Sequence, residues 1–200
     1  MSNKGFLLVV LLLLRFMNPA NSQVKAKVDM IGGGNYTWMR NNVLQGEQPA
    51  FGFNFGTGII VEPSPKWKRV SFGVNFLFSK KGYKQLLGHE YKVEFYYLST
   101  QWLTLYKISN AITSYGGFDL SGLIDTNVTH GLDTYRNSDF GLVLGLLFFD
   151  NKALSINAQL VYGLTPLLDY YKIDPVGNLT SFKDLRNSCI SLGVRYRIVK

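Results

Sequence analysis

The stretch Ala153–Thr165 reads ALSINAQLVYGLT, and its residues alternate between two kinds of side chain. One set is apolar throughout: Leu154, Ile156, Ala158, Leu160, Tyr162 and Leu164. The other set is polar or smaller: Ser155, Asn157, Gln159, Val161 and Gly163. A period of two is typical of a β-strand whose two faces meet different surroundings. The stretch therefore predicts a strand with one oily face and one small or polar face.

The end of the chain repeats this alternation and adds charge. Its oily face holds Ile190, Leu192, Val194, Tyr196 and Ile198, and its other face holds Ser191, Gly193, Arg195 and Arg197. Two successive arginines on one face resist burial in an apolar core, because an unpaired buried charge costs several kcal/mol. In a polar lumen they find carboxylates or water. This strand therefore favours a barrel with a polar interior.

Residues 51–61 and 71–79 place large residues on one face and glycine, asparagine or serine on the other. A soluble sandwich or a lipocalin-like carrier turns its large residues inward and covers its outside with lysine and glutamate. Here the second face has little charge and much glycine and asparagine. This inverted pattern indicates a tight lumen inside and lipid outside.

Such alternation recurs in eight segments: 25–38, 49–62, 69–81, 90–107, 112–123, 138–149, 153–166 and 188–199. The connections alternate in length. The long ones are Asn41–Gln48, Gly82–His89, Asp125–Asn137 and Leu167–Asn187, and the short ones are Pro63–Lys68, Ser109–Ala111 and Asp150–Lys152. Short turns at one end and long loops at the other are typical of outer-membrane barrels. We predict an all-β fold, an eight-stranded antiparallel up-and-down transmembrane β-barrel with both termini periplasmic.

The first 22 residues have the features of a secretory signal peptide. Lys4 precedes the apolar run Phe6–Leu14, and the small residues Ala20 and Ser22 stand where a peptidase would cut. The run is too short to span a bilayer, which takes about 20 residues. We therefore expect cleavage after Ser22, with Ala20 as the alternative, and a single barrel domain over residues 23–200.

Charge and cysteine content limit the other classes. The net charge of +8 and the pI of about 9.5 come from basic residues dispersed over turns and strand ends. Dispersal favours affinity for an anionic membrane surface over nucleic-acid binding, which is not predicted. Cys189 is the single cysteine, so no intrachain disulfide can form and stability has to come from packing or a closed sheet.

Catalytic and metal-binding residues are not predicted. His89 precedes Glu90, and His130 lies near Asp133 and Ser138, but nearness along a loop does not supply the geometry of a catalytic triad. Two distant histidines and one cysteine have no metal-ligand spacing. We expect no catalytic site, no metal and no cofactor.

A charge network in the lumen is the structural site that the pattern does predict. Arg195 and Arg197 on the last strand face the first strand, which carries Lys25, Lys27 and Asp29. Such a network would close the barrel and stabilise it. By inward parity, Glu62 and Glu94 are further partners. Aromatic residues near strand ends predict interfacial girdles: Tyr36, Trp38, Trp67, Tyr91, Trp102, Tyr106, Tyr115, Tyr170 and Tyr171.

The run Phe78–Lys84, FSKKGYK, resembles the strand-to-loop passage of the PorT-like outer-membrane β-barrel family of Bacteroidetes. Further blocks resemble its fourth, sixth, seventh and closing strands: Tyr97-Leu98 with Leu103–Lys107, Asp139–Gly145, Tyr162–Leu164 and Ser191–Tyr196. The sequence departs from the family at Ser99–Trp102, where an acidic residue and an Ile-Pro pair are common, and at Lys200, where an aromatic residue is usual. The resemblance implies an integral outer-membrane protein that assists protein secretion, and it offers no catalytic residues.

The sequence thus predicts a non-enzymatic outer-membrane barrel whose outer loops, chiefly 167–187 and 125–137, or whose periplasmic turns contact another envelope component. The expected partners are outer-membrane lipid, the barrel-insertion machinery, for which the last strand offers Tyr196 and Ile198, and secretion-system subunits. A narrow pore or small-solute binder, a loop-sited hydrolase or acyltransferase, and a soluble lipocalin-like carrier remain alternatives.

Overall fold

The computed structural model describes residues 25–40, 47–63, 69–87, 89–128, 135–173 and 179–199. Its strands are β1 (Lys25–Arg40), β2 (Glu47–Glu62), β3 (Val70–Leu87), β4 (His89–Lys107), β5 (Ile112–Thr126), β6 (Ser138–Phe148), β7 (Leu154–Ile173) and β8 (Leu179–Val199). The predicted signal peptide, Trp67 and His130 lie outside the described residues. No helix in these ranges has the length and hydropathy needed to cross a membrane.

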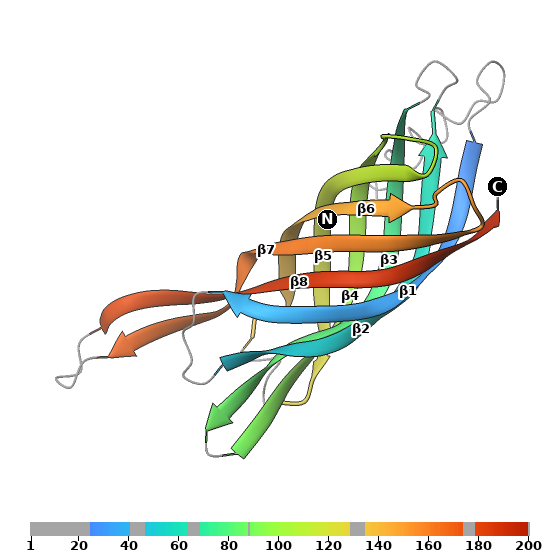
Figure 1. Cartoon of the computed structure of the whole chain (residues 1–200). Coiled ribbons are helices and arrows are strands. Elements are labelled where there is room, and N and C mark those ends of the chain that lie inside the picture. Colours follow the sequence, from blue (N-terminus) through green and yellow to red (C-terminus); the bar gives the residue numbers. More distant parts are fainter. Residues whose placement is uncertain are drawn as a thin grey trace, which may run out of the picture.

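The strands form a closed antiparallel barrel in chain order, and β8 pairs back onto β1 (Figure 1). At this seam Asp29 lies opposite Arg197, Gly33 opposite Gly193 and Thr37 opposite Cys189. The predicted all-β, eight-stranded up-and-down fold is confirmed. The end that carries the connections 63–69, 108–111 and 149–153 is called the turn end below, and the opposite end the loop end.

The predicted long connections at the loop end are partly wrong. The segment Gly82–His89 is mostly strand, because β3 and β4 pair as far as Leu87 and His89. The segment 167–187 is also mostly strand, with Leu168 paired to Leu185 and Ile173 to Leu179. Both hairpins project beyond the barrel wall (Figure 1). Beyond the apolar side chains of the wall, the outer face of a strand is polar, so the sequence there lacks the outward apolar alternation that marks the other strands.

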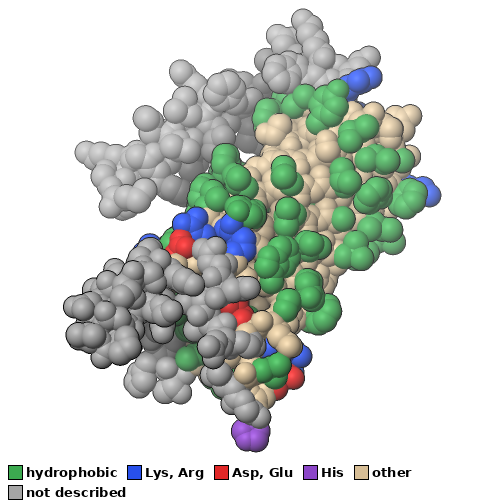
Figure 2. All heavy atoms as spheres, turned by 60° about the vertical axis from the view of Figure 1, so that its left-hand side comes forward, with side chains coloured by type: hydrophobic (Ala, Val, Ile, Leu, Met, Phe, Trp, Pro, Cys, Tyr) green, Lys and Arg blue, Asp and Glu red, His purple; other side chains and the backbone are tan. Residues whose placement is uncertain are grey.

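Large apolar side chains cover the outside of the barrel wall (Figure 2). The exposed fraction is 80% for Phe51, 64% for Leu192 and 62% for Leu144. The exposed apolar residues are drawn from all eight strands, among them Met30, Phe55, Phe76, Trp102, Phe118, Leu142, Ile156 and Ile190. So many exposed large apolar residues on every strand are more than soluble proteins usually expose. They form an apolar belt around the barrel.

The predicted aromatic girdles are confirmed in part. Tyr36, Trp102 and Tyr106 are exposed on the outside of the wall. Tyr91 is exposed too, but it has the parity of the buried residues Val93 and Phe95, so it is not on the outer face. Tyr115 is a wrong prediction, because it is buried in the lumen, where its hydroxyl donates a hydrogen bond of 2.5 Å to Asn157 Oδ1. The side chains of Tyr170 and Tyr171 fall outside the described part of the structure.

The lumen is filled by side chains, with an apolar cluster toward each end. The loop-end cluster holds Met39, Tyr83, Val93, Phe95, Tyr97, Leu123, Leu167 and Leu185. The second cluster holds Ile60, Leu103, Leu105, Tyr115, Val143, Leu147, Val161 and Cys189. Buried polar side chains fill the rest of the lumen. An interior of this size is wide enough for side chains alone, as is usual for eight strands.

Glycine allows the seam between β1 and β8 to close tightly. A Cβ atom on Gly33 would lie 2.7 Å from the Cα atom of Gly193, and one on Gly193 would lie 2.4 Å from the Gly32 carbonyl oxygen. Side chains cannot tolerate such contacts, so the two strands approach at a point where neither carries one. The tight seam brings the charged residues of β8 next to β1.

Candidate functional site

The seam brings three of the predicted charged residues together in the lumen. Arg197 Nε donates a hydrogen bond of 3.2 Å to Asp29 Oδ1, and Arg195 Nη1 lies 3.6 Å from Asp29 Oδ2. Arg195 and Asp29 are each only 1% exposed. The register places Asp29 directly opposite Arg197, and the period of two then turns Arg195 to the same face.

The two predicted lysines lie at the rim. Lys27 Nζ forms an ion pair of 2.5 Å with Glu62 Oε1, which is one of the predicted further partners. Lys25 is exposed and has no ion pair within the described residues. Of the predicted network, Arg195, Arg197 and Asp29 therefore share one cluster, while Lys27 and Lys25 do not contact it.

Glu94 is a wrong prediction, because it lies on the outside of the wall. Its Oε1 atom pairs with Lys80 Nζ at 2.6 Å, and its Oε2 atom accepts a hydrogen bond of 3.1 Å from the Tyr96 hydroxyl. The neighbours Val93 and Phe95 are buried in the loop-end cluster. Here β4 has risen above the apolar belt, and the pattern returns to apolar inside and polar outside.

From Arg195 a chain of hydrogen bonds crosses the lumen. Arg195 Nη2 donates to Asn75 Oδ1 at 2.8 Å, and Asn75 Nδ2 donates to Gln101 Oε1 at 3.0 Å. Gln101 Nε2 then donates to Asp119 Oδ1 at 3.1 Å. All four side chains are buried. The chain joins β8 to β5 through β3 and β4, so it braces opposite walls of the barrel.

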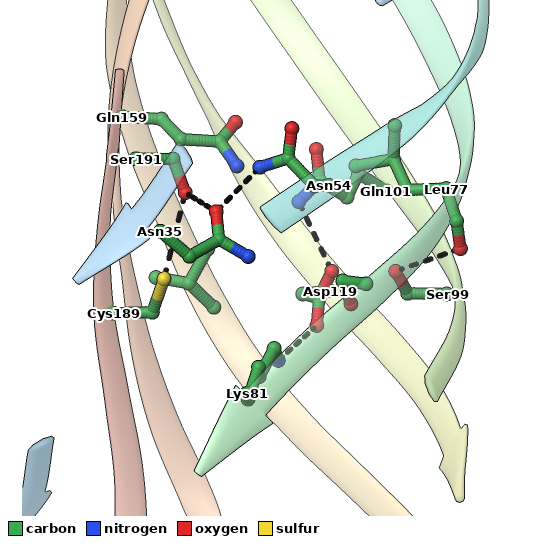
Figure 3. A pocket seen from close by; sticks show the side chains of 12 residues that line it. Asn35, Asn54, Leu77, Lys81, Ser99, Gln101, Asp119, Gln159, Cys189 and Ser191 are labelled. Atoms are coloured by element: carbon green, nitrogen blue, oxygen red, sulfur yellow. Dashed lines mark hydrogen bonds and ion pairs between the residues drawn. The ribbon is translucent and has the colours of Figure 1, made fainter. Parts of the chain in front are cut away.

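The chain continues to a buried lysine between two aspartates (Figure 3 shows Lys81 and Asp119). Lys81 Nζ lies 3.8 Å from Asp119 Oδ2 and 3.9 Å from Asp139 Oδ2. Asp119 Oδ2 also accepts a hydrogen bond of 2.6 Å from the Ser121 hydroxyl. Separations near 4 Å suit water-mediated contact better than direct hydrogen bonds. Lys81 thus balances carboxylates contributed by β5 and β6.

At the turn end the chain reaches the connection between β6 and β7. Arg197 Nη2 donates to Asp150 Oδ1 at 2.9 Å, and Thr113 Oγ1 donates to Asp150 Oδ2 at 2.9 Å. We call the whole series the lumen chain: Asp150, Arg197, Asp29, Arg195, Asn75, Gln101, Asp119, Lys81 and Asp139. It runs from the turn end toward the apolar loop-end cluster.

A second polar group beside the lumen chain centres on Asn35 (Figure 3). Asn35 Oδ1 accepts hydrogen bonds from Asn54 Nδ2 at 2.6 Å and from the Ser191 hydroxyl at 2.7 Å. Asn35, Asn54, Ser191, Lys81 and Asp119 line a small cavity. The cavity has room for about one water molecule. It is too small to admit an organic ligand or to serve as an open channel.

Sequence reasoning missed the part of the lumen chain that lies away from the seam. Asn75 belongs to the glycine, asparagine and serine face of residues 71–79, and the same period of two extends through Ser79 to Lys81. That parity could have identified Lys81 as a lumen residue. Its pairing with Asp119 and Asp139 depends on the barrel's stagger between strands, which the sequence pattern does not define.

The residues considered for catalysis are not assembled by the described structure. His89 is exposed at the start of β4, and Ser138 is exposed at the start of β6. His130 and Asp133 lie outside the described residues. Within the described ranges, no group of three or more His, Cys, Asp or Glu side chains could hold a metal ion. Cys189 is buried and lies 3.4 Å, Sγ to Oγ, from Ser191.

Two carboxyl groups beyond the apolar belt have shifted pKa values. A hydrogen bond and the charge of Lys84, with help from Lys92, hold the pKa of the exposed Glu90 carboxyl below its usual value. Burial raises the pKa of Glu47, at the loop end of β2, to about 7. These groups lie on different hairpins, and neither belongs to the lumen chain.

No family model and no curated protein match the sequence. Solved structures of three proteins show a distant likeness. Neisserial surface protein A is 13% identical, with 86% of this chain and 97% of that chain covered and a TM-score of 0.47. Ail of Yersinia pestis, in complex with the heparin analogue sucrose octasulfate, is 14% identical, with 86% of this chain and 97% of that chain covered and a TM-score of 0.46. The outer membrane protein OprG of Pseudomonas aeruginosa is 11% identical, with 90% of this chain and 99% of that chain covered and a TM-score of 0.45. The resemblance to the PorT-like family stays a prediction.

Proposed function

We propose that this chain is an integral outer-membrane protein of a Gram-negative bacterium, with a plugged lumen and no catalytic activity, that acts through its exposed ends. One observation carries the proposal: large apolar side chains are exposed on the outside of the barrel, while charged and polar side chains are buried in its lumen. In water this arrangement would expose a large oily surface, whereas in a bilayer the belt faces acyl chains. The closed ladder leaves no strand edge in the lipid, which a membrane-spanning sheet requires.

The filled lumen argues against the alternative of a narrow pore or small-solute binder. The lumen chain links side chains from opposite walls, and the loop-end cluster covers it with apolar side chains. An ion would have to break buried hydrogen bonds and then cross an apolar layer. Both steps are costly, because a charge without polar partners is strongly unfavourable in an apolar environment.

We expect purified, folded protein in planar bilayers to give no stable conductance steps at moderate voltage and salt. Folding is checked in the same sample by heat-modifiable gel mobility, so that an absence of conductance cannot be attributed to unfolded protein. A double variant that removes cover from the loop-end cluster, Phe95→Ala with Tyr97→Ala, serves as comparison. Regular conductance steps from the wild-type protein would contradict the plugged-lumen proposal and support the pore.

The role in protein secretion rests on the PorT-like resemblance of segments such as Phe78–Lys84 and Asp139–Gly145. A barrel without passage or catalysis contributes to an envelope machine by holding a partner at the membrane. The loop-end hairpins of β3–β4 and β7–β8 offer surface for such contact, because they extend past the barrel wall (Figure 1).

A pull-down from mild-detergent envelope extract tests the secretion role. A tagged copy at native expression should retain secretion-system subunits, identified by mass spectrometry, whereas an unrelated tagged eight-stranded barrel should not. Recovery of the barrel-insertion machinery alone would indicate biogenesis contacts and would contradict the secretion role. The same extract also reports whether the protein fractionates with the outer membrane.

A further inference from the structure

Exposed basic residues without carboxylate partners gather at the turn end. They are Lys25, Arg69, Lys107 and Lys152, which we call the turn-end collar. None of the four forms an ion pair within the described residues. The carboxylates at this end, Asp29, Glu62 and Asp150, already pair with Arg197 or Lys27. No carboxylate of the described residues therefore neutralises the positive charge of the collar.

Backbone contacts place the collar around one rim. The Lys107 amide donates to the Arg69 carbonyl at 2.7 Å, so these two residues are neighbours. The Phe149 amide donates to the Ala111 carbonyl at 2.6 Å, which ties the turn carrying Lys152 to the next hairpin. Lys25 lies opposite Glu62 at the end of β2. The four cations are thus distributed over successive hairpins instead of forming one spot.

Exposed aromatic rings accompany two of these cations. Arg69 Nη1 donates a hydrogen bond of 3.5 Å to the Tyr106 hydroxyl, and Lys152 Nζ lies 5.3 Å from the centre of the Phe149 ring. Tyr106 is 45% exposed and Phe149 is 46% exposed. Phe149 has a φ of 61°, a conformation in which a bulky residue is rare. The ring is left exposed beside the Lys152 ammonium group.

The loop end differs, because the described lysines on its outer face are paired with carboxylates. Lys80 pairs with Glu94 at 2.6 Å, and Lys84 and Lys92 pair with Glu90 at 3.0 Å and 3.7 Å. Among the lysines whose side chains the structure describes, those without a carboxylate partner therefore lie at the turn end, next to the apolar belt.

We propose that the turn-end collar binds the anionic headgroups of phospholipids in the leaflet that surrounds this end. This proposal rests on the proposed membrane location. Aromatic rings beside cations suit the boundary between acyl chains and phosphate groups, where the ring lies in the apolar layer and the charge meets the phosphate. A basic residue near an anionic surface favours anionic over neutral lipid by about fivefold.

Lipid retention in nanodiscs tests the collar. Folded protein is placed in an equimolar mixture of phosphatidylglycerol and phosphatidylcholine, and native mass spectrometry counts the lipids that stay bound. We expect the wild-type protein to retain phosphatidylglycerol in excess, by about fivefold, with the excess declining in high salt as charges are screened. The variant Arg69→Gln, Lys107→Gln, Lys152→Gln should lose most of this excess.

The matched control is Lys80→Gln, Lys84→Gln, Lys92→Gln, which removes the same charge at the loop end and should keep the excess. Equal loss in both variants would mean that net charge alone attracts the lipid, and would overturn the proposal. The proposal would also be overturned if inserted, heat-modifiable wild-type protein retained phosphatidylglycerol and phosphatidylcholine in a ratio near one. Failure of the wild-type protein to insert at all would instead contradict the membrane location itself, so the two failures are distinguishable.

Discussion

Replacing Arg195 by leucine should lower the free energy of unfolding by about 3 kcal/mol, because the substitution breaks a buried ion pair and leaves its partners uncompensated. Asp29 would lose one of its two arginines, and Asn75 would lose the donor to its side-chain oxygen. The measurement is the urea concentration at which the heat-modifiable gel band disappears. An unchanged midpoint would show that the lumen chain contributes nothing to stability.

Two further variants separate the charge from the change in shape. Tyr196→Leu alters the adjacent residue of β8, which faces outward and is 55% exposed, and should leave the midpoint nearly unchanged. The double variant Arg195→Leu, Asp29→Leu should lose less stability than the sum of the single variants. Removing both charges leaves no unpaired partner between them, so the two effects are not additive.

Replacing Lys81 by methionine should have a comparably large effect, about 3 to 5 kcal/mol near neutral pH. Lys81 is the buried cation that lies between Asp119 and Asp139, and methionine keeps the length of the side chain without the charge. The two carboxylates would then face each other inside the barrel without a cation between them. The loss should appear as a lower urea midpoint of the heat-modifiable form.

Adding Asp139→Asn to Lys81→Met should recover part of the loss, because it removes one of the two carboxylates that repel each other once the cation is gone. If the double variant unfolds at the same urea concentration as Lys81→Met, the assigned role of Lys81 as the cation that balances both carboxylates is contradicted.

The strands within the apolar belt could be predicted from sequence because membrane and lumen impose opposite demands on successive residues. β7 shows this in Ile156 and Asn157, one exposed outside and one buried inside. The same rule assigned Arg195 and Arg197 to the lumen. Proximity to Asp29 followed because the last strand of a closed barrel has to pair with the first.

The alternation of apolar outer and polar inner residues ends where the strands extend beyond the apolar belt. This explains why the prediction for Glu94 and the predicted loop-end connections are wrong. Above Leu98 on β4 the outside is aqueous, so Tyr96 and Glu94 lie outside while Phe95 lies inside. The polar-inside pattern therefore predicts the wrong face for Glu94, which lies above the belt. The hairpin ends of β3–β4 and β7–β8 were assigned to loops for the same reason. The pairing of Lys81 with Asp139 could not be predicted, because it depends on the stagger between strands, which the sequence of one strand does not define.

The seam between β1 and β8 has a consequence for how the chain folds. Asp29 pairs with Arg197, so the closing contact joins residues from opposite ends of the domain. Contacts of such wide sequence separation form slowly, because closing the long loop costs conformational entropy before the pairing stabilises the fold. Until β8 has arrived, β1 presents an open edge that can pair with another chain. The unfinished protein should therefore depend on chaperones during its transit, and any truncation that removes β8 should yield aggregates in place of a smaller barrel.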